Sequence, residues 1–372
     1  MGRRGHILLL GLVFLWVVSG GCRSEPVNSG EAPRLVVSDT VTLKPLFRLG
    51  DTPALLFGVV RAAFFDRQGR LWVADGQAAA LYVFGPDGAL LQQIGQQGEG
   101  PGEFQAIGGM VRGVNDSVYV WDWRLQRLSV FTPTGAFVHA FSATFGTWPL
   151  RGLPEGILVM YSAPFRAGED ADDQGRRRIV QLLNFDGSVR IDTVLSLPDA
   201  AYVILRGATF VSVRVAPFGR RPIIRVDSAG HIWYGQTDRL ELFRYDWRRG
   251  ETRRVLQYAV TPVPVVRAER DSLLESAPML REAQYTFPEH KPAFTNFVVN
   301  EAGTRIWVAL SRPYRRPTVS WVVFDETGRP LGVVPLARHL TVLAVSDTRL
   351  AALDEDRQIV ILYELPEPLR AT

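Results

Sequence analysis

Short apolar segments and glycine-containing turns repeat along the first half of the chain at a constant spacing. Two copies lie between residues 64 and 141, and each holds an aromatic strand, an Asp, a second apolar strand and a Gly turn. The matched positions, all 47 residues apart, are Trp72 and Tyr119, Asp75 and Asp122, Phe84 and Phe131, and Gly88 and Gly135. A period of roughly 40 to 50 residues with several short strands per copy is typical of a β-propeller blade.

Further copies extend this pattern to the end of the chain. They begin near residues 156, 232, 306 and 350, so that the chain holds six copies. The sixth copy ends near Pro366, one strand short, whereas Leu46–Leu49 has the pattern of a last strand with no copy before it. We therefore expect residues 41–49 to pair with the final blade and cover its edge. The sequence predicts an all-β fold, a six-bladed β-propeller closed by an N-terminal strand.

The connections between the predicted strands are of two kinds. In a meander of strands a, b, c and d, the a–b and c–d turns emerge on one face of the ring, and the b–c and d–a loops emerge on the other. The tight turns are all of the first kind. The long insertions are all of the second kind, and they cover residues 163–178, 197–222, 262–293 and 311–317. We call these faces the plain face and the loop-rich face, and we expect the functional site on the loop-rich face.

One insertion, between blades 4 and 5, has the pattern of a short helix. Residues 265–284 place Leu273, Met279 and Leu280 at roughly helical spacing, with Pro278 between them. Because proline disrupts a helix interior, we expect two helical pieces packed on the loop-rich face. An amphipathic helix that binds a partner is the alternative.

The repeated aromatic and acidic residues have structural explanations in this fold. Large aromatic side chains at repeated strand positions are expected in the core between blades, namely Trp72, Tyr119, Trp233 and Trp307. Acidic residues at strand ends are expected to hold turns rather than a ligand, namely Asp75, Asp122 and Asp354.

The N-terminus has the pattern of a secretion signal. A basic segment, Gly2–Arg4, precedes the apolar run Ile7–Val18 and small residues before Cys22, the chain's single cysteine. The run is short for a membrane span, and the pattern resembles a bacterial lipoprotein signal, in which the cysteine after the cleavage site is lipidated. An ordinary secretory signal is the alternative. We expect a signal peptide over residues 1–21, a lipidated Cys22, a flexible tether over 22–40, the propeller over 41–366 and a tail over 367–372.

Charge and cysteine content exclude two classes of site. The formal net charge is +4, and loss of a signal that contains Arg3 and Arg4 leaves about +2. Nucleic-acid binding needs a stronger and more concentrated basic surface, so we expect no nucleic-acid partner. A single cysteine provides neither a disulfide framework nor a thiolate metal cage.

The repeated motif resembles a known family. It reads Asp-x-x-Gly-x-(Leu/Ile)-(Trp/Tyr)-Val-x-Asp, followed by Val-x-Phe-x-x-x-Gly, and a Gly-Pro-Gly-Glu-Phe run ends at Phe104 between two copies. These features are similar to those of NHL-like six-bladed β-propellers, and with the N-terminal signal the chain resembles propeller lipoproteins of Gram-negative bacteria. The likeness covers Val41–Pro366. It implies the fold, but its motifs hold no catalytic residue and imply no activity.

Arginine and aromatic residues gather in the predicted loops of the loop-rich face. The guanidinium group of Arg can donate paired hydrogen bonds to carboxylate, phosphate or sulfate groups, and aromatic faces can stack on sugar rings or peptide side chains. The candidate ligand-binding residues are Arg312, Tyr314, Arg315, Arg316, Arg166 and Trp148. Two prolines stiffen residues 311–317, which reduces the entropy lost on binding. The alternative is a solvated hairpin whose arginines pair with neighbouring loops.

No catalytic motif accompanies these candidates. The His residues after the signal are His139, His231, His290 and His339, and their expected positions do not converge on a zinc site. We therefore predict no catalytic residue, no cofactor and no metal ligand, while a structural or channel calcium site held by carboxylates stays open.

The sequence as a whole favours binding over catalysis. We expect a monomer, lipid-anchored to a membrane of the bacterial cell envelope outside the cytoplasm, that binds an envelope protein or a glycan on its loop-rich face. The alternative is a lactonase-like, metal-dependent hydrolase or lyase that acts in the central channel.

Overall fold

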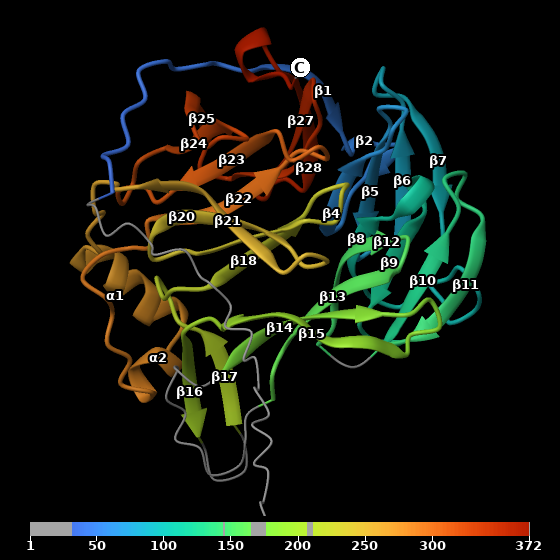
Figure 1. Ribbon diagram of the computed structural model, residues 1–372, viewed down its shortest axis with the longest axis horizontal. Coiled ribbons are helices and arrows are strands. Elements are labelled where there is room, and N and C mark those ends of the chain that lie inside the picture. The colour runs from blue at the N-terminus through green and yellow to red at the C-terminus, as the bar shows by residue number, and fades with distance from the viewer. Residues whose placement is uncertain (1–31, 144–145, 165–175, 207–210, 372) are drawn as a thin grey trace, which may run out of the picture. The chain divides into compact units, whose positions relative to one another are not determined.

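The computed structural model describes residues 32–143, 146–164, 176–206 and 211–371. The chain divides into two units, Met1–Ala32 and Pro33–Thr372, and every described strand and helix belongs to the second. This unit is a six-bladed β-propeller, as the sequence predicts, with six antiparallel sheets of four strands (Figure 1). No helix within the described ranges is long and apolar enough to cross a membrane.

The first three blades are meanders in which consecutive strands pair. Blade 1 contains β4 (Val60–Phe65), β5 (Leu71–Asp75), β6 (Ala80–Phe84) and β7 (Leu90–Ile94). Blade 2 contains β8 (Ile107–Arg112), β9 (Val118–Asp122), β10 (Arg127–Phe131) and β11 (Phe137–Ser142). Blade 3 contains β12 (Trp148–Leu153), β13 (Gly156–Ser162), β14 (Arg177–Leu183) and β15 (Val189–Pro198).

The other three blades complete the ring. Blade 4 contains β18 (Pro222–Val226), β19 (Ile232–Gln236), β20 (Leu240–Asp246) and β21 (Glu251–Tyr258). Blade 5 contains β22 (Phe294–Val299), β23 (Arg305–Leu310), β24 (Thr318–Asp325) and β25 (Pro330–Ala337). Blade 6 contains β26 (Leu340–Val345), β27 (Arg349–Asp354), β28 (Ile359–Glu364) and the N-terminal β1 (Lys44–Leu49). The first strands of neighbouring blades contact one another all around the ring.

The N-terminal strand closes the ring in the predicted way. β1 pairs antiparallel with β28, from Lys44 opposite Glu364 to Leu49 opposite Val360. In Figure 1 this blue strand lies beside the red strands from the end of the chain. Leu49 joins a buried cluster with residues of blades 1 and 6, so closure joins the two blades through their side chains as well as their backbones.

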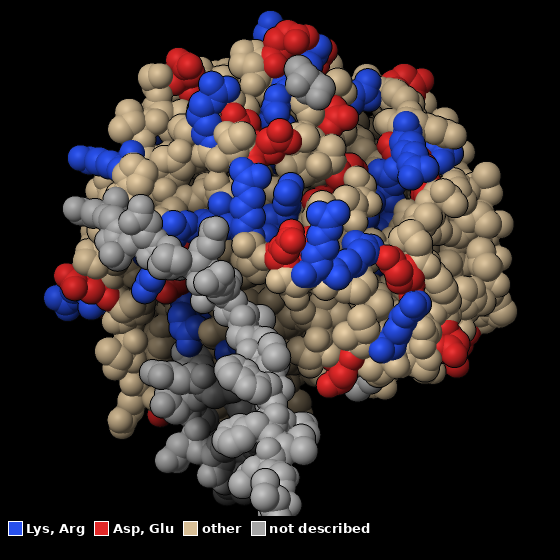
Figure 2. Space-filling model, viewed as in Figure 1, with Lys and Arg blue, Asp and Glu red and all other residues tan. Residues whose placement is uncertain are grey.

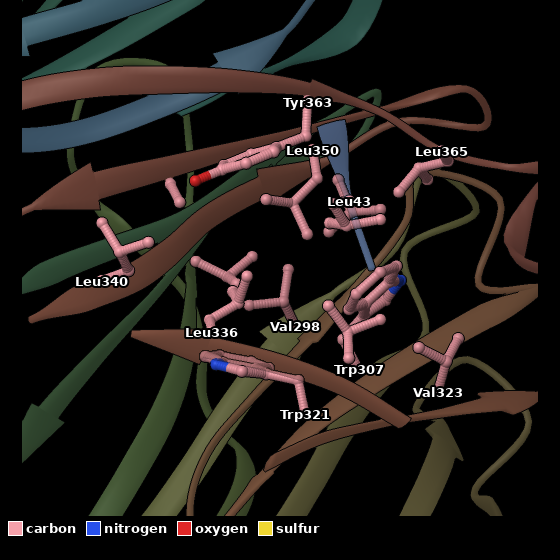
Figure 3. Close-up of a cluster of buried hydrophobic side chains, with 14 of the residues drawn as sticks. Leu43, Val298, Trp307, Trp321, Val323, Leu336, Leu340, Leu350, Tyr363 and Leu365 are labelled. Atoms are coloured by element: carbon pink, nitrogen blue, oxygen red, sulfur yellow. The ribbon is translucent and has the colours of Figure 1, made fainter. Parts of the chain in front are cut away.

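Apolar side chains fill the space between neighbouring blades. The side chains of Trp72, Trp233 and Trp307 are at most 1% exposed and that of Tyr119 is 5% exposed, which confirms the expected core role of the repeated aromatic position. Figure 3 shows one such cluster between blades 5 and 6, in which Trp307 and Trp321 lie among aliphatic side chains. Strands β5 and β9 are buried at every position, because both of their faces pack against other blades.

Buried Asp residues hold the loops, as expected. Asp75 accepts hydrogen bonds of 2.7–3.1 Å from four backbone N–H groups, two before β4 and two after β5. Asp122 makes four equivalent contacts of 2.6–3.1 Å in blade 2. Asp354 accepts one from Arg357 at 3.1 Å. In blades 1 and 2 one carboxylate thus fixes a d–a loop to a b–c loop on the loop-rich face.

Residues 33–41 form a strap across the outer edges of blades 4 and 5. One pair of backbone hydrogen bonds, both 2.9 Å, joins the strap to Ala259, and a second pair, both 2.8 Å, joins it to Val333. Leu35 and Val37 pack against the core between blades 4 and 5. The prediction of a flexible tether up to residue 40 is therefore wrong for residues 33–40, because apolar side chains dock this segment. At the other end Leu369 is fully buried, so the packed chain also extends beyond the predicted boundary at residue 366.

The long insertions of the loop-rich face contain further elements. As predicted, the one between blades 4 and 5 holds two helical pieces, α1 (Arg267–Ser276) and α2 (Met279–Glu282), separated at Pro278. The insertion between blades 3 and 4 forms a hairpin that the sequence did not predict, β16 (Tyr202–Arg206) and β17 (Val211–Val215). The hairpin and helices share a small apolar cluster and lie together in Figure 1. The remaining short elements are β2 (Asp51–Thr52), β3 (Leu55–Leu56), η1 (Val114–Asp116) and η2 (Glu367–Leu369).

Ring closure predicts unequal effects of two substitutions in β1. Leu49 is 5% exposed and Leu46 is 38% exposed. Leu49→Ala should lower the free energy of unfolding by about 2–5 kcal/mol, because it leaves a cavity between blades 6 and 1. Leu46→Ala should change it by less than about 1 kcal/mol. Urea denaturation measures both, and equal losses would show that β1 contributes backbone pairing alone.

Candidate functional site

A pocket of about 430 Å³ opens on the loop-rich face among the inner strands of blades 1, 2 and 3. Three blades contribute to it because their first strands begin side by side at this end of the ring. Its lining residues are Arg61 in β4, Gly108 in β8, Trp121 in β9, Trp123 after β9, Gly146, and Trp148 at the start of β12. We call it the tryptophan pocket.

Glycines make room for the indole rings. A Cβ atom at Gly108 would lie 3.0 Å from Cδ1 of Trp121 and 3.4 Å from Cδ1 of Trp123. A Cβ atom at Gly109 would lie 3.7 Å from Cε3 of Trp148. Glycine at position 108 therefore lets Trp121 approach β8 closely, whereas a Cβ atom at position 109 would make only an ordinary contact with Trp148.

The tryptophan pocket combines exposed aromatic surface with positive charge. Trp123 and Trp148 are each 41% exposed, whereas Trp121 is buried apart from the edge that faces the pocket. No carboxylate lines the pocket, and none within the described ranges forms an ion pair with Arg61. A second cation lies nearby, since Cζ of Arg124 is 5.7 Å from the ring centroid of Trp123.

The repeat itself contained a signal for this pocket. In blade 1 the positions 61, 74 and 76 hold Arg, Ala and Gly, and in blade 2 the positions 47 residues later, 108, 121 and 123, hold Gly, Trp and Trp. Large and small side chains are thus exchanged between copies at positions that surround the channel. Sequence reasoning used the matched positions and did not consider these mismatched ones, so among the residues that line this pocket it named Trp148 but not Trp121, Trp123 or Arg61.

Residues 311–317, which we call the arginine hairpin, lie in blade 5 and border two other pockets. Arg312 and Arg316 line one of about 610 Å³ with residues 260–264 and 290–293, and Arg312 also lines an adjoining pocket of about 420 Å³. The guanidinium of Arg312 donates to the carbonyl of Arg316 at 3.1 Å, and Nζ of Lys291 donates to the carbonyl of Arg312 at 3.0 Å. Cζ of Arg315 lies 5.4 Å from the ring centroid of Tyr314.

The predicted site residues therefore fall in two places. Four of them share the arginine hairpin, namely Arg312, Tyr314, Arg315 and Arg316. Trp148 belongs to the tryptophan pocket, which shares no lining residue with the pockets at the hairpin. Arg166 lies outside the described residues.

The plain face also has a pocket, of about 690 Å³, at its end of the channel. Glu301 of blade 5 accepts two hydrogen bonds from Arg151 of blade 3, at 3.1 and 2.6 Å, and lies 3.3 Å from Arg112 of blade 2. Figure 2 shows a similar mixture of charges on one face of the molecule, where basic side chains gather near the centre with acidic ones beside several of them. Because both arginines already pair with the carboxylate of Glu301, this pocket is less suited to binding an anionic ligand.

A metal site would need several ligands close together. No group of three or more His, Cys, Asp and Glu residues that could hold a metal occurs in the described part of the chain. The ring of His231 lies 3.1 Å from Asp227 in an a–b turn, and the ring of His139 lies 3.1 Å from the carbonyl of Phe185 on the outside of the ring of blades.

A buried carboxylate supports the insertions of the loop-rich face. Asp199, fully buried at the end of β15, accepts two hydrogen bonds from Arg178 at 3.0 and 2.8 Å and lies 3.5 Å from Arg176. Burial raises the pKa of Asp199, but hydrogen bonding by Ser162 and the charge of Arg178 outweigh it, so that the pKa lies below its usual value. These arginines, which belong to a run of three consecutive arginines, join the bases of two insertions.

The lowered pKa of Asp199 predicts a pH-dependent contribution to stability. Asp199→Asn should cost about 1–3 kcal/mol at neutral pH, because Arg178 loses its charged partner. The contribution is complete above the unfolded-state pKa of about 4 and is lost as the pH falls through the lower folded-state pKa. The difference between the two proteins in urea denaturation should therefore shrink below about pH 4. A difference that does not change with pH would contradict this account.

Comparison with known proteins supports the fold. Residues 55–111 match the model of a family described as a 6-bladed beta-propeller. The chain is similar to a DUF4221 family member from Bacteroides vulgatus, with 12% identity, 90% of this chain and 98% of that chain covered, and a TM-score of 0.50. It is also similar to a candidate exported protein from Bacteroides fragilis, with 13% identity, 90% of this chain and 93% of that chain covered, and a TM-score of 0.45. A third similar structure is the calcium-binding protein regucalcin from Agrobacterium tumefaciens, with 10% identity, 90% of this chain and 100% of that chain covered, and a TM-score of 0.43. No protein of curated function matches the sequence. At these identities the likeness concerns the fold alone.

Proposed function

We propose that the protein is a binding module of the bacterial cell envelope, without chemistry of its own, that is held at a membrane through lipidated Cys22. Its ligand is a glycan or a glycan-bearing macromolecule of the envelope, and it binds on the loop-rich face. The tryptophan pocket is the observation that carries this proposal.

The composition of the tryptophan pocket suits a sugar ring. Its volume, about 430 Å³, lies within the usual range for small-ligand sites. Two indole rings with large exposed areas in one concavity offer flat apolar surfaces, and the C–H face of a sugar ring can stack on such surfaces. The lining consists of Trp, Gly and one Arg, and none of these is a nucleophile or a general acid–base group in neutral solution. The pocket therefore favours binding over catalysis.

The arginine hairpin is a second contact on the same face. Arg315 and Arg316 would meet anionic groups of a large ligand, while Tyr314 would add an aromatic face. We assign Arg312 a supporting role, because its guanidinium donates a hydrogen bond within the hairpin. This bond holds the hairpin shape that exposes Arg315 and Arg316. Arg166 remains a proposal from the sequence.

The proposal predicts which substitutions abolish binding. Trp123→Ala and Trp148→Ala should each weaken glycan binding about tenfold or more, because each removes a stacking surface. Phe185→Ala is the matched control, since Phe185 is 43% exposed but lies in a c–d turn of the plain face. A glycan array followed by titration of the bound glycans measures the effect, with melting temperature as the test of folding.

An Arg312→Ala, Arg315→Ala, Arg316→Ala triple variant completes this experiment. It should retain binding of short glycans and lose retention of large envelope partners. If all tryptophan variants bind as the wild type does while the triple variant loses every ligand, the site lies at the arginine hairpin instead.

Anchoring makes a separate prediction. Cys22→Ser should move the protein from the membrane fraction to the soluble fraction, because the substituted chain has no thiol to lipidate. Incorporation of labelled palmitate into the parent chain provides the second readout. Membrane retention of the variant, with no label in the parent, would reject lipidation.

A further inference from the structure

We propose that the tryptophan pocket selects an acidic sugar, one with a carboxylate on its ring, and that Arg61 is the residue that recognises this carboxylate. The inference rests on the proposed function and names the ligand class of the same site.

Gly76 leaves room for the exposed side chain of Arg61 at the wall of the pocket. Arg61 is the second residue of β4, and the b–c loop of its blade passes close by at Gly76. A Cβ atom at Gly76 would lie 2.9 Å from Cγ and 3.0 Å from Nε of Arg61, and 2.9 Å from the carbonyl oxygen of Ile107. Glycine is thus required at position 76 for the Arg61 side chain to lie along this loop.

Arg61 has no acidic partner among the described residues, whereas several other arginines of the propeller do. Arg112 and Arg151 both lie beside Glu301, and Arg178 bonds to Asp199. For Arg61, by contrast, the described residues contain no carboxylate within ion-pair distance. Glu301 thus neutralises Arg112 and Arg151 at the plain-face end of the channel, whereas Arg61 has no carboxylate partner among the described residues and lies at the end where a ligand can enter.

The surroundings of Arg61 strengthen a bond to an anion. Indole rings and glycines line the remaining wall, so a bound carboxylate would be partly shielded from water, and charge-assisted hydrogen bonds gain strength in such surroundings. A guanidinium offers two parallel N–H groups to one carboxylate. Arg124, beside Trp123, adds a second positive charge and disfavours a cationic ligand.

The tryptophans favour a sugar as the carrier of that carboxylate. Trp123 and Trp148 provide flat apolar surfaces, and no described residue accepts a hydrogen bond from the indole N–H of either ring. A sugar ring has an apolar C–H face for stacking and hydroxyl groups that can accept from indole N–H groups. A sugar acid satisfies the stacking surface, the N–H donors and the unpaired guanidinium together.

The test uses full-length protein in detergent and two β-1,4-linked trisaccharides, one of glucuronate and one of glucose, which differ only in the C6 carboxylate. Tryptophan fluorescence and calorimetry give the affinities of the wild type and of Arg61→Gln, Arg61→Lys, Trp148→Ala and Arg67→Gln. Arg67 is the matched control, because it borders the plain-face pocket. An inorganic phosphate titration distinguishes recognition of the sugar acid from general anion binding.

The wild type should bind the glucuronate trisaccharide about tenfold or more tightly than the glucose trisaccharide. Arg61→Gln should abolish this preference by weakening binding of the glucuronate trisaccharide, and Arg61→Lys should keep part of the preference. Arg67→Gln should behave as the wild type, and Trp148→Ala should weaken both sugars. The preference should fall as the salt concentration rises.

Three results would overturn the inference where the protein binds either trisaccharide. They are equal affinities of the wild type for both trisaccharides, an undiminished preference in Arg61→Gln, and phosphate binding as tight as that of glucuronate. If the wild type binds both trisaccharides with equal affinity and Trp148→Ala weakens both, the proposed glycan-binding function would still hold. Absence of binding to either trisaccharide also overturns the acid preference, and the glycan array then decides the proposed function separately.

Discussion

The pairing of β1 with β28 is the interaction on which the rest of the protein depends. Every blade buries apolar side chains against two neighbours, so an open ring would leave blades 6 and 1 with one uncovered side each. The same closure fixes the loop-rich face. The tryptophan pocket takes residues from three different blades, and its shape exists only while their inner strands stay in register around the channel.

The sequence was sufficient to predict the fold because similar residues carry the same structural role in several copies. The aromatic residue at Trp72 and its equivalents fills the core between blades, and the carboxylate at Asp75 and Asp122 holds two loops together. Such roles are local to a blade and recur with the period. The orphan strand at residues 46–49 likewise indicated closure, since a missing strand at one end of a cyclic array needs a spare strand at the other.

The site was harder to predict because it depends on differences between copies and on contacts between distant segments. Trp121, Trp123 and Arg61 stand where the repeats disagree, and their convergence with Trp148 is a property of the ring. Arg178 is one of three consecutive arginines, and the sequence does not reveal that its partner is Asp199, 21 residues away. The strap was misread because its composition is that of a linker, while Leu35 and Val37 dock on blades reached only in the folded chain.

The strap also gives the protein a defined response to mechanical load. A pulling force applied at the N-terminal end of residues 33–41 would act first on the pair of hydrogen bonds at Ala259, then on the pair at Val333, and only afterwards on β1. The strap, held by two separate pairs of bonds and by the docked side chains of Leu35 and Val37, would open in steps, whereas a strand bonded along its whole length resists shear. The strap would therefore peel away and lengthen the chain before the ring opened, so that tension reaching the propeller is relieved while its blades and their loops keep their places.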